Sequence, residues 1–326
     1  MSEENLWTAW NRFRRGKRRR PDVIAFERRL DDEITAIAAD LVRGTYQHGA
    51  YDAFIIRDPK VRIIHKATVR DRVVHQALYD ALTSMWERRF LPQSYGCRLK
   101  KGVHRAIARV AVLLRSVSGN GRREAWVLHG DIAQFFPSID HAMLLSLLQH
   151  MPMDGRLYGI CAEVIGSYAP SSHRGLPLGN LTSQLFGNVY LHELDRFVIH
   201  ELRRSAYVRY ADDFFLVSDS RAILDDLVPA LRLFLADVLH LTCSQLDVRR
   251  WSHGADVLGA VLFPWGAVPR RRQRLAAEHC AHSIAVDGCT TDEWRRAVSY
   301  LGMLERTRSV RLREQLRLAL LDRCVG

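Results

Sequence analysis

The sequence predicts an α+β fold in which helices back a small sheet that contains an antiparallel hairpin. Two observations lead to this prediction. Segments with helical spacing of apolar residues alternate along the chain with short runs of β-branched and aromatic residues. The stretch YVRYADDFFLVSDS, residues 207–220, has two such runs on either side of Asp212 and Asp213, as expected for a hairpin with acids at its tip.

The first part of the chain is expected to be mainly helical. Apolar periodicity predicts helices over residues 22–43, 70–90 and 101–117. The segment 53–67 indicates two short strands around a turn at 57–60, where Asp and Pro are adjacent. An exposed loop at 118–124 then precedes an apolar strand that runs from Trp126 and ends at Asp131.

The second part alternates loops, helices and hairpins. Residues 175–202 begin with a Gly/Pro loop and continue as a long helix, and residues 220–241 form another amphipathic helix. Pro229 is expected to kink this second helix or to mark its true start. Residues 255–269 predict an apolar hairpin, and the chain beyond Arg270 is expected to be helical and basic.

The charge balance favours a polyanionic partner. The 326 residues include 48 basic and 36 acidic side chains, which gives a net charge of +12. The excess is concentrated in three blocks, residues 12–21, 269–274 and 306–317. Such blocks attract nucleic acids, although a solvated face or a basic tail is the alternative.

Membrane association and export are not expected. No stretch approaches the roughly 18 uninterrupted apolar residues of a membrane span, and the first ten residues lack the apolar run of a signal peptide. The sequence therefore predicts a cytoplasmic protein without a membrane partner.

Three carboxylates are the candidate chemical centre. Asp131 ends an apolar strand, while Asp212 and Asp213 lie at a hairpin tip. If the two strands are neighbours in one sheet, the acids meet at one edge and offer the hard oxygen ligands that Mg²⁺ prefers. Two such ions can activate a hydroxyl and stabilise a leaving pyrophosphate. Taken alone, the Asp pair favours a solvated turn, since Asp is common in turns.

Six blocks in order resemble the conserved blocks of reverse transcriptases. They occupy residues 57–78, 90–107, 128–140, 175–191, 208–220 and 257–266. The third contains GDIAQFF, the fifth is the YADD box and the sixth is similar to the primer-grip hairpin. A lone YADD is weak evidence, whereas six ordered blocks over about residues 20–266 are specific.

The resemblance implies a right-hand polymerase with fingers, a palm whose antiparallel sheet is backed by helices, and a short helical thumb. The corresponding segments are a basic N-terminal segment 1–21, fingers with the first palm elements 22–125, a palm with the YADD box and primer-grip hairpin 126–268, and a basic thumb 269–326.

The resemblance also assigns catalytic roles. Asp131, Asp212 and Asp213 match the catalytic acids. Asp131 and Asp212 would hold two Mg²⁺ ions, for which Mn²⁺ can substitute, and the carbonyl of Ile132 would be a further ligand. Asp213 would support the primer or the metals more loosely.

Further residues match positions that bind nucleotide, primer or template. The implied nucleotide-binding residues are Arg62, Lys66, Arg70, Arg72, Phe136, Leu178, Gly179 and Gln184, and the implied primer or template residues are Tyr210, Leu258 and Gly259. The ring of Phe136 would exclude a 2′-hydroxyl and so select deoxynucleotides; a core aromatic is the alternative. The fingers cations would bind the triphosphate, with Arg62 the best match, or else be solvated charges.

The loop GLPLGNLTSQ indicates the subclass. Leu178 stands where many reverse transcriptases have a hydrogen-bonding Gln, and the GxxxSQ pattern of Gly179, Ser183 and Gln184 resembles the enzymes of diversity-generating retroelements. Those enzymes copy a template-repeat RNA into cDNA with errors opposite adenine. The resemblance implies dNTPs, a structured template RNA and a pentameric accessory variability protein as partners, in a bacterial or phage-encoded system.

One departure and two alternatives accompany this interpretation. No Lys follows the YADD hairpin where many members have one as general acid to pyrophosphate; Arg249, His253 or water could replace it. Another bacterial reverse transcriptase, of the retron, group II intron or phage-defence type, is the first alternative. A catalytically silent RNA-binding scaffold of the same fold is the second.

Overall fold

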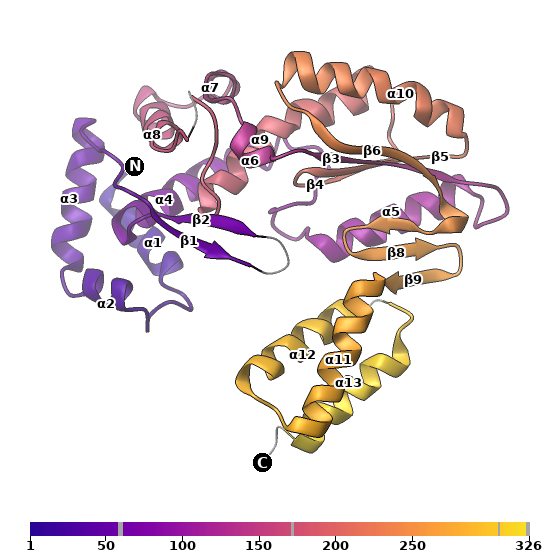
Figure 1. Ribbon diagram of the computed structural model, residues 1–326. Helices are drawn as coiled ribbons and strands as arrows, with labels where there is room; N and C mark the ends of the chain where they lie inside the picture. Colours follow the sequence, from indigo (N-terminus) through magenta and orange to yellow (C-terminus); the bar gives the residue numbers. More distant parts are fainter. Residues whose placement is uncertain (58–60, 171–172, 306, 324–326) are drawn as a thin grey trace. The chain divides into compact units, whose positions relative to one another are not determined.

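The computed structural model describes residues 1–57, 61–170, 173–305 and 307–323 (Figure 1). The chain divides into two compact units. Unit 1 comprises Met1–Lys100, Asp131–Arg203 and Ala230–Gln245, and unit 2 comprises Lys101–Gly130, Arg204–Pro229 and Leu246–Gly326. The four segments expected from the sequence stay a prediction.

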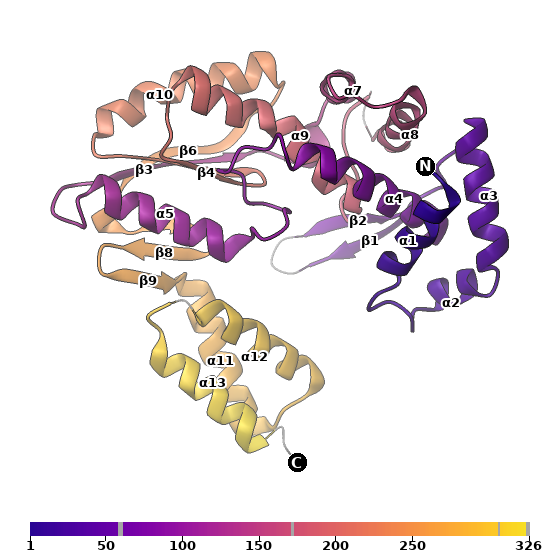
Figure 2. The same cartoon turned by 180° about the vertical axis from the view of Figure 1, so that it is seen from behind.

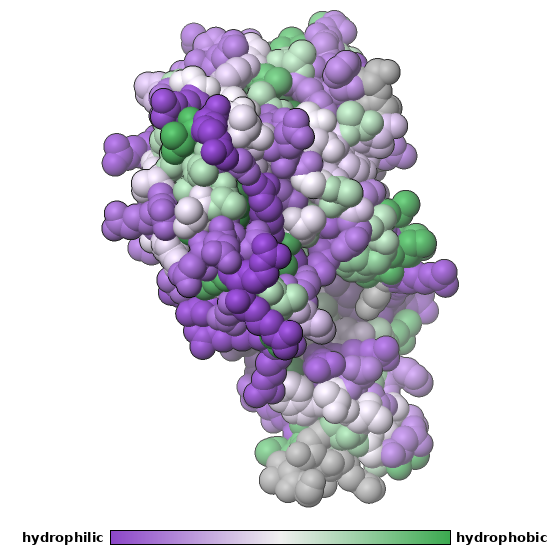
Figure 3. All heavy atoms as spheres, turned by 90° about the vertical axis from the view of Figure 1, so that its left-hand side faces the viewer, coloured by the Kyte–Doolittle hydropathy of each residue, from purple (hydrophilic) through white to green (hydrophobic). Residues whose placement is uncertain are grey.

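The N-terminal segment, residues 1–21, begins with a folded helix. Helix α1, Glu3–Phe13, begins with a capping box between Ser2 and Asn5 and packs through buried Leu6 and Trp10 against α4, Val69–Trp86. The face that carries these N-terminal helices is mostly hydrophilic, with smaller apolar areas between the polar ones (Figure 3). The N-terminal helix was not anticipated from the sequence.

The single helix predicted over residues 22–43 is wrong in one respect. The structure has two helices, α2 (Pro21–Glu27) and α3 (Leu30–Arg43), separated by Arg29 with φ −125° and ψ 30°. The break redirects the chain, so that Phe26 reaches the ring of Trp10 at 5.2 Å while the apolar side of α3 is buried separately.

Unit 1 also contains a strand pair, the short helix α6 (Phe135–Ser138) and three longer helices, of which the last is mostly buried. Strands β1 (Asp52–Ile56) and β2 (Arg62–Lys66) pair antiparallel, as predicted; most of the expected turn at 57–60 lies outside the described residues. Helices α7 (His141–Gln149) and α8 (Gly155–Gly166) precede α9, Leu181–Arg196, which continues as a π-helix, Phe197–Glu201. Most of α9 is buried, which confirms the long helix after the Gly/Pro loop.

A four-stranded sheet carries two of the candidate acids, Asp131 and Asp213, and the third, Asp212, lies in the turn between two of its strands. Its strands are β3 (Trp126–Ile132), β4 (Tyr207–Tyr210), β5 (Asp213–Ser218) and β6 (Cys243–Arg250), in the order β4-β5-β3-β6. Helix α5, Val103–Val117, packs against β4 and β5, and α10, Arg221–Leu233, covers the opposite face (Figures 1 and 2). The predicted α+β class with an antiparallel hairpin is confirmed.

Pro229 does not mark the start of its helix. Helix α10 runs over Arg221–Leu233 with Pro229 inside it, and a π-helical turn, Phe234–Val238, follows. A proline cannot donate a backbone hydrogen bond, and a wider turn is a common local adjustment of a helix.

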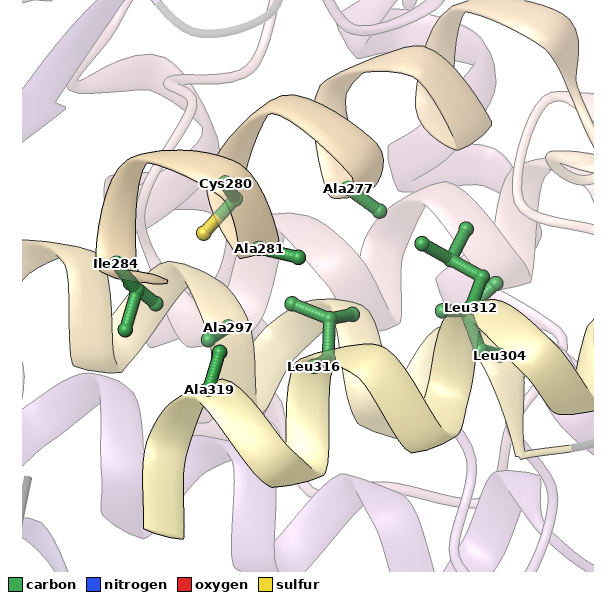
Figure 4. Close-up of a cluster of buried hydrophobic side chains, with 9 residues drawn as sticks. All are labelled: Ala277, Cys280, Ala281, Ile284, Ala297, Leu304, Leu312, Leu316 and Ala319. Carbon is green, nitrogen blue, oxygen red and sulfur yellow. The ribbon is translucent and has the colours of Figure 1, made fainter. Parts of the chain in front are cut away.

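The C-terminal part of unit 2 has its own core. The predicted hairpin is a three-stranded meander of β7 (Ala255–Val257), β8 (Ala260–Phe263) and β9 (Gly266–Pro269), preceded by a short 3₁₀ turn, Trp251–His253. Helices α11 (Arg271–Asp287), α12 (Thr291–Leu304) and α13 (Val310–Arg323) bury a small apolar cluster between them (Figure 4). Within the described part of the chain, no helix is long and apolar enough to cross a membrane.

Candidate functional site

The YADD residues form the predicted hairpin tip. Tyr210 pairs with Asp213, which leaves Ala211 and Asp212 as a two-residue turn between β4 and β5. Ala211 has φ +53°, a conformation that costs a non-glycine residue about 1 kcal/mol or more. The fully buried Arg209 stabilises the turn, because its guanidinium donates a hydrogen bond to the carbonyl of Ala211 at 3.1 Å.

The acid that begins β5 is held by a histidine from β3. The Nε2 atom of His129 lies 2.7 Å from Oδ1 of Asp213, and its ring stacks on Phe215 with centroids 4.6 Å apart. The next residue, Gly130, lies directly against the ring of Phe214. The two residues that precede Asp131 in the chain therefore contact the strand that follows the YADD turn.

We expect Gly130→Ala to destabilise unit 2. An added Cβ would lie 2.1 Å from Cζ of the buried Phe214 ring, so the strands must separate or the ring must move. Overpacking of this kind costs about 2–3 kcal/mol. Urea unfolding measures the loss, and Gly159→Ala in α8 is the matched control, because nothing lies within 4 Å of its added Cβ. Equal stability of the two variants would contradict the expected close approach.

Asp131 is half-buried near the end of β3 and is held by a serine. Ser244 Oγ, on β6, donates to the Asp131 carboxylate and lies 3.2 Å from its carbonyl oxygen. Just beyond it, the N–H of Ala133 donates to the carbonyl of Thr242 at 2.8 Å, while Ile132 is buried. Ser244 was not predicted from the sequence, because it lies 113 positions from Asp131 and belongs to none of the six blocks.

The loop before α9 brings several predicted nucleotide-binding residues together within unit 1. The N–H of Leu176 donates to the carbonyl of Phe136 at 2.8 Å. On the other side, the carbonyl of Leu178 accepts from the N–H of His65 at 3.0 Å, and the Asn180 amide donates to the His65 carbonyl at 2.9 Å. This loop therefore joins β2, which carries Arg62 and Lys66, to the segment of Phe136.

Two glycines allow the close packing of this region. Gly179 has φ +106°, and a Cβ there would lie 2.6 Å from Cγ2 of Ile64 on β2. Gly187 of α9 packs against Phe135 and Phe136, since its added Cβ would lie 3.0 Å and 3.4 Å from their rings. Phe136 is half-buried, whereas Gln184 is exposed on the first turn of α9.

The predicted phosphate-binding cations differ in their surroundings. Arg62 is exposed at the start of β2. Lys66 and Arg72 both pair with Asp22, at 2.7 Å and 2.6 Å, and Arg70 pairs with Asp40 at 2.5 Å. Lys66 and Arg72 also line a cavity of about 300 Å³, together with two cations that sequence reasoning did not assign, Lys17 and Arg20, and with Gly179 and Asn180 of the loop.

We expect Asp22→Asn to lower the free energy of unfolding at pH 5 and to weaken its decrease at lower pH. Burial raises the pKa of Asp22, but hydrogen bonds from Lys66 and Arg72 outweigh it and hold the pKa at about 2, below its usual 3.8. Asp22 therefore stabilises the fold above its usual pKa, and this contribution is lost as the pH falls towards 2. Solvent screening limits it to about 1 kcal/mol. Urea unfolding between pH 5 and pH 2 measures it.

The control for Asp22 is Glu193→Gln, which removes an ion pair to Arg196 on the surface of α9. This change should alter stability by only a few tenths of a kcal/mol. If Asp22→Asn kept the wild-type dependence of unfolding free energy on pH, the ion pairs at Asp22 would not contribute to folding.

A buried polar network supports the same loop. His75 on α4 lies 2.5 Å from the hydroxyl of Thr182 and 2.9 Å from the ring of His48, nitrogen to nitrogen. Burial, and then the neighbouring His48, lower the pKa of His75 to about 3, so the ring is neutral and serves as a hydrogen-bonding group. These two histidines lay outside the sequence prediction, because nothing local distinguishes them from core residues.

The predicted primer or template residues lie in unit 2. Leu258 and Gly259 form the two-residue turn between β7 and β8, with φ +52° and +94°. Gly259 also approaches the amide of Gln273, and both turn residues line a cavity of about 350 Å³ with parts of α5, α11 and α12. Tyr210 is half-buried at the end of β4.

Neither candidate for the missing lysine is distinguished by its contacts. Arg249 lies on β6 with its guanidinium 3.4 Å from the Asp247 carboxylate, and His253 is exposed in the 3₁₀ turn. The role of either residue as an acid stays a prediction.

The carboxylates of the hairpin turn and of strands β3 and β5 are chemically suited to bind a hard cation. Asp131, Asp212 and Asp213 are partly exposed carboxylates, the oxygen ligands that Mg²⁺ prefers. Among the residues with described positions, no group of three or more His, Cys, Asp and Glu side chains is arranged to hold a metal ion.

Comparisons with known proteins identify the family. A family model described as reverse transcriptase (RNA-dependent DNA polymerase) matches residues 56–261. Protein YkfC of Escherichia coli is 28% identical over 230 residues, covering 58% of this chain and 59% of that protein. The group II intron-encoded protein LtrA of Lactococcus lactis is 28% identical over 178 residues, covering 52% of this chain and 28% of LtrA. The chain thus spans less than two thirds of YkfC and less than a third of LtrA.

Similarity to a solved structure shows the fold. A telomerase from Candida albicans, in complex with a fragment of telomeric RNA, matches 87% of this chain and 58% of its own, with a TM-score of 0.54 and 11% identity. The right-hand polymerase fold expected from the motifs is therefore confirmed. With the family model covering more than half of its length, this chain belongs to the reverse transcriptase family.

Proposed function

We propose that the protein is an RNA-directed DNA polymerase that extends a primer with dNTPs on an RNA template. The observation that carries this proposal is the contact of His129 and Gly130 with Asp213 and Phe214, which places the two residues before Asp131 beside the YADD hairpin. The intact set of three acids distinguishes a polymerase from a silent scaffold, which needs no carboxylates at these positions.

The chain's own groups have separable roles in this mechanism. Asp131 and Asp212, with the carbonyl of Ile132, would hold two Mg²⁺ ions, which when bound activate the primer 3′-hydroxyl and stabilise the leaving pyrophosphate. Ser244 and His129 orient the carboxylates of Asp131 and Asp213 through their hydrogen bonds.

The remaining roles concern the nucleotide and the primer. Phe136 limits the space at the sugar of the incoming nucleotide. The loop at Leu178 and Gly179 lies beneath the nascent base pair, and Gln184, on the first turn of α9, follows this loop. Arg62, with Lys66, Arg70 and Arg72, provides positive charge for the triphosphate. Tyr210, Leu258 and Gly259 position the primer.

Primer extension tests the proposal. Purified protein is incubated with an RNA template, an annealed DNA primer, Mg²⁺ and dNTPs, and the products are separated by length. We expect extension that depends on the RNA template and on the divalent ion. If the wild type gave no extension even with its native RNA, and still bound that RNA, a binding scaffold would be the better interpretation.

We further propose the subclass of diversity-generating retroelement, in which the cDNA carries errors opposite adenine. The loop supports this, since Leu178 holds β2 through its backbone carbonyl while its side chain is apolar and cannot hydrogen-bond to a base pair or a sugar. The proposed partners are the template-repeat RNA and a pentameric accessory protein. The similarity to LtrA favours a group II intron-like enzyme as the second candidate.

Leu178→Gln is expected to lower misincorporation opposite adenine. The Gln amide can hydrogen-bond to a correctly paired nucleotide. A mismatched nucleotide would lose this hydrogen bond, so its incorporation would have a higher barrier. We expect misincorporation to fall about tenfold. Sequencing cDNA made on a defined adenine-containing RNA measures the error spectrum. Leu178→Met is the matched control, because it changes shape without adding a hydrogen bond. An unchanged spectrum in Leu178→Gln, or a wild type without adenine-directed errors, would favour the intron-like candidate.

A further inference from the structure

A stacked aromatic pair, an exposed Trp265 and a half-buried Phe263, marks the turn between β8 and β9. Phe263 pairs with Gly266, so Pro264 and Trp265 form a two-residue turn. The ring of Trp265 lies parallel to that of Phe263 within 9°, with centroids 4.9 Å apart, and 52% of Trp265 is exposed. A single exposed tryptophan is ordinary, whereas one held flat against a second ring is a preformed stacking surface.

A glycine packs against the Phe263 ring of this aromatic pair. Gly254, with φ +91°, lies against the ring of Phe263, since an added Cβ would be 2.7 Å from its Cζ atom. Phe263 therefore contacts both the backbone of Gly254 and the indole of Trp265. The orientation of the indole is set before any ligand binds, which lowers the entropic cost of stacking.

A guanidinium lies over the indole. The Cζ atom of Arg308 is 6.0 Å from the Trp265 ring centroid, and the backbone N–H of Arg308 donates to the carbonyl of Ala267 at 2.9 Å, which holds this residue next to the hairpin. Gly266 permits this approach, because an added Cβ would lie 2.6 Å from Nε of Arg308.

More positive charge follows the hairpin. Strand β9 leads directly into α11 (Figure 1), whose start carries four exposed arginines, Arg270, Arg271, Arg272 and Arg274. Two of them have acidic partners, Asp256 for Arg270 and Glu278 for Arg274. Aromatic rings among cations bind single-stranded nucleic acid by stacking bases and neutralising phosphates. Charge complementarity therefore favours a polyanion with exposed bases over an apolar protein partner.

We propose that Trp265 is a stacking platform for an unpaired base of single-stranded RNA, with Arg308 contacting a neighbouring phosphate. This deepens the proposed function, because it takes RNA as the partner, but it does not require catalysis. The platform contributes affinity for any sequence, since every base has a flat face.

The test is binding of a fluorescently labelled single-stranded RNA of about twelve nucleotides, measured by anisotropy at several salt concentrations. Trp265→Ala should weaken binding about tenfold, and Trp265→Phe should recover most of the loss, because one base stack is worth about one to two factors of ten. The slope of log affinity against log salt should stay that of the wild type in Trp265→Ala. It should fall by about one unit in Arg308→Gln, because this change removes a cation that releases a counterion when it contacts a phosphate.

Two controls make the result specific. Trp294→Ala on α12 removes a tryptophan of similar exposure, 48%, and should leave affinity unchanged. An abasic oligonucleotide of the same length should bind wild type and Trp265→Ala equally. Equal affinity of wild type and Trp265→Ala for the RNA, or equal losses on RNA and on the abasic strand, would overturn the platform. Primer extension measured in parallel keeps the two proposals apart, since a protein that binds RNA through Trp265 but extends no primer contradicts only the polymerase.

Discussion

Asp212→Ala is expected to lower cDNA synthesis by about a thousandfold or more while RNA binding persists. Asp212 occupies the hairpin turn, and the proposed mechanism gives it both metal ions to hold. Loss of such a ligand removes several kcal/mol of transition-state stabilisation, and about 4 kcal/mol corresponds to three factors of ten. RNA binding depends instead on the distributed positive charge, which this change leaves in place.

The measurement is single-turnover primer extension, with RNA affinity determined on the same preparation. Asp219→Ala is the matched control, because Asp219 lies just beyond β5, is exposed, and is 4.0 Å from Arg123 in a surface ion pair. It should retain wild-type activity. Extension by Asp212→Ala at more than about a tenth of the wild-type rate would contradict the assignment of this carboxylate.

Phe136→Ala is expected to raise the incorporation of ribonucleotides relative to deoxynucleotides by about a hundredfold. The Phe136 ring is held by Phe135, with centroids 5.2 Å apart, and by Gly187 of α9, so it cannot easily move aside for a larger sugar. Exclusion of one hydroxyl by such a wall is worth about 2–3 kcal/mol, and truncation to Ala removes the wall.

The selectivity ratio is measured as kcat/KM for matched rNTP and dNTP pairs on the same primer and template. Phe136→Tyr keeps the ring and should keep the selectivity. Some loss of stability accompanies Phe136→Ala, so a ratio of two nucleotides on one protein is the informative quantity. An unchanged ratio would assign Phe136 to the core alone.

Much of the site could be predicted because its parts are local. The YADD hairpin follows from apolar runs on either side of a two-residue turn, and the long buried helix follows from the Gly/Pro loop at its start. Neighbouring residues set turn chemistry and helical periodicity, so the sequence exposes both directly. The hydrogen bonds of the loop bring Phe136, Leu178 and β2 into one region, while the nucleotide-binding roles of these residues stay a prediction.

The sequence by itself therefore determined the family, most of the element types and the position of the two adjacent acids at the hairpin tip. Only the tertiary structure decided the partners of the charged side chains. Ser244 contacts Asp131, His129 contacts Asp213, and Asp22 pairs with both Lys66 and Arg72. The tertiary structure also decided the break between α2 and α3 and the burial of α1. The physical reason is range, since periodicity and turns depend on residues a few positions apart, while ion pairs and buried hydrogen bonds join residues that only the folded chain brings together.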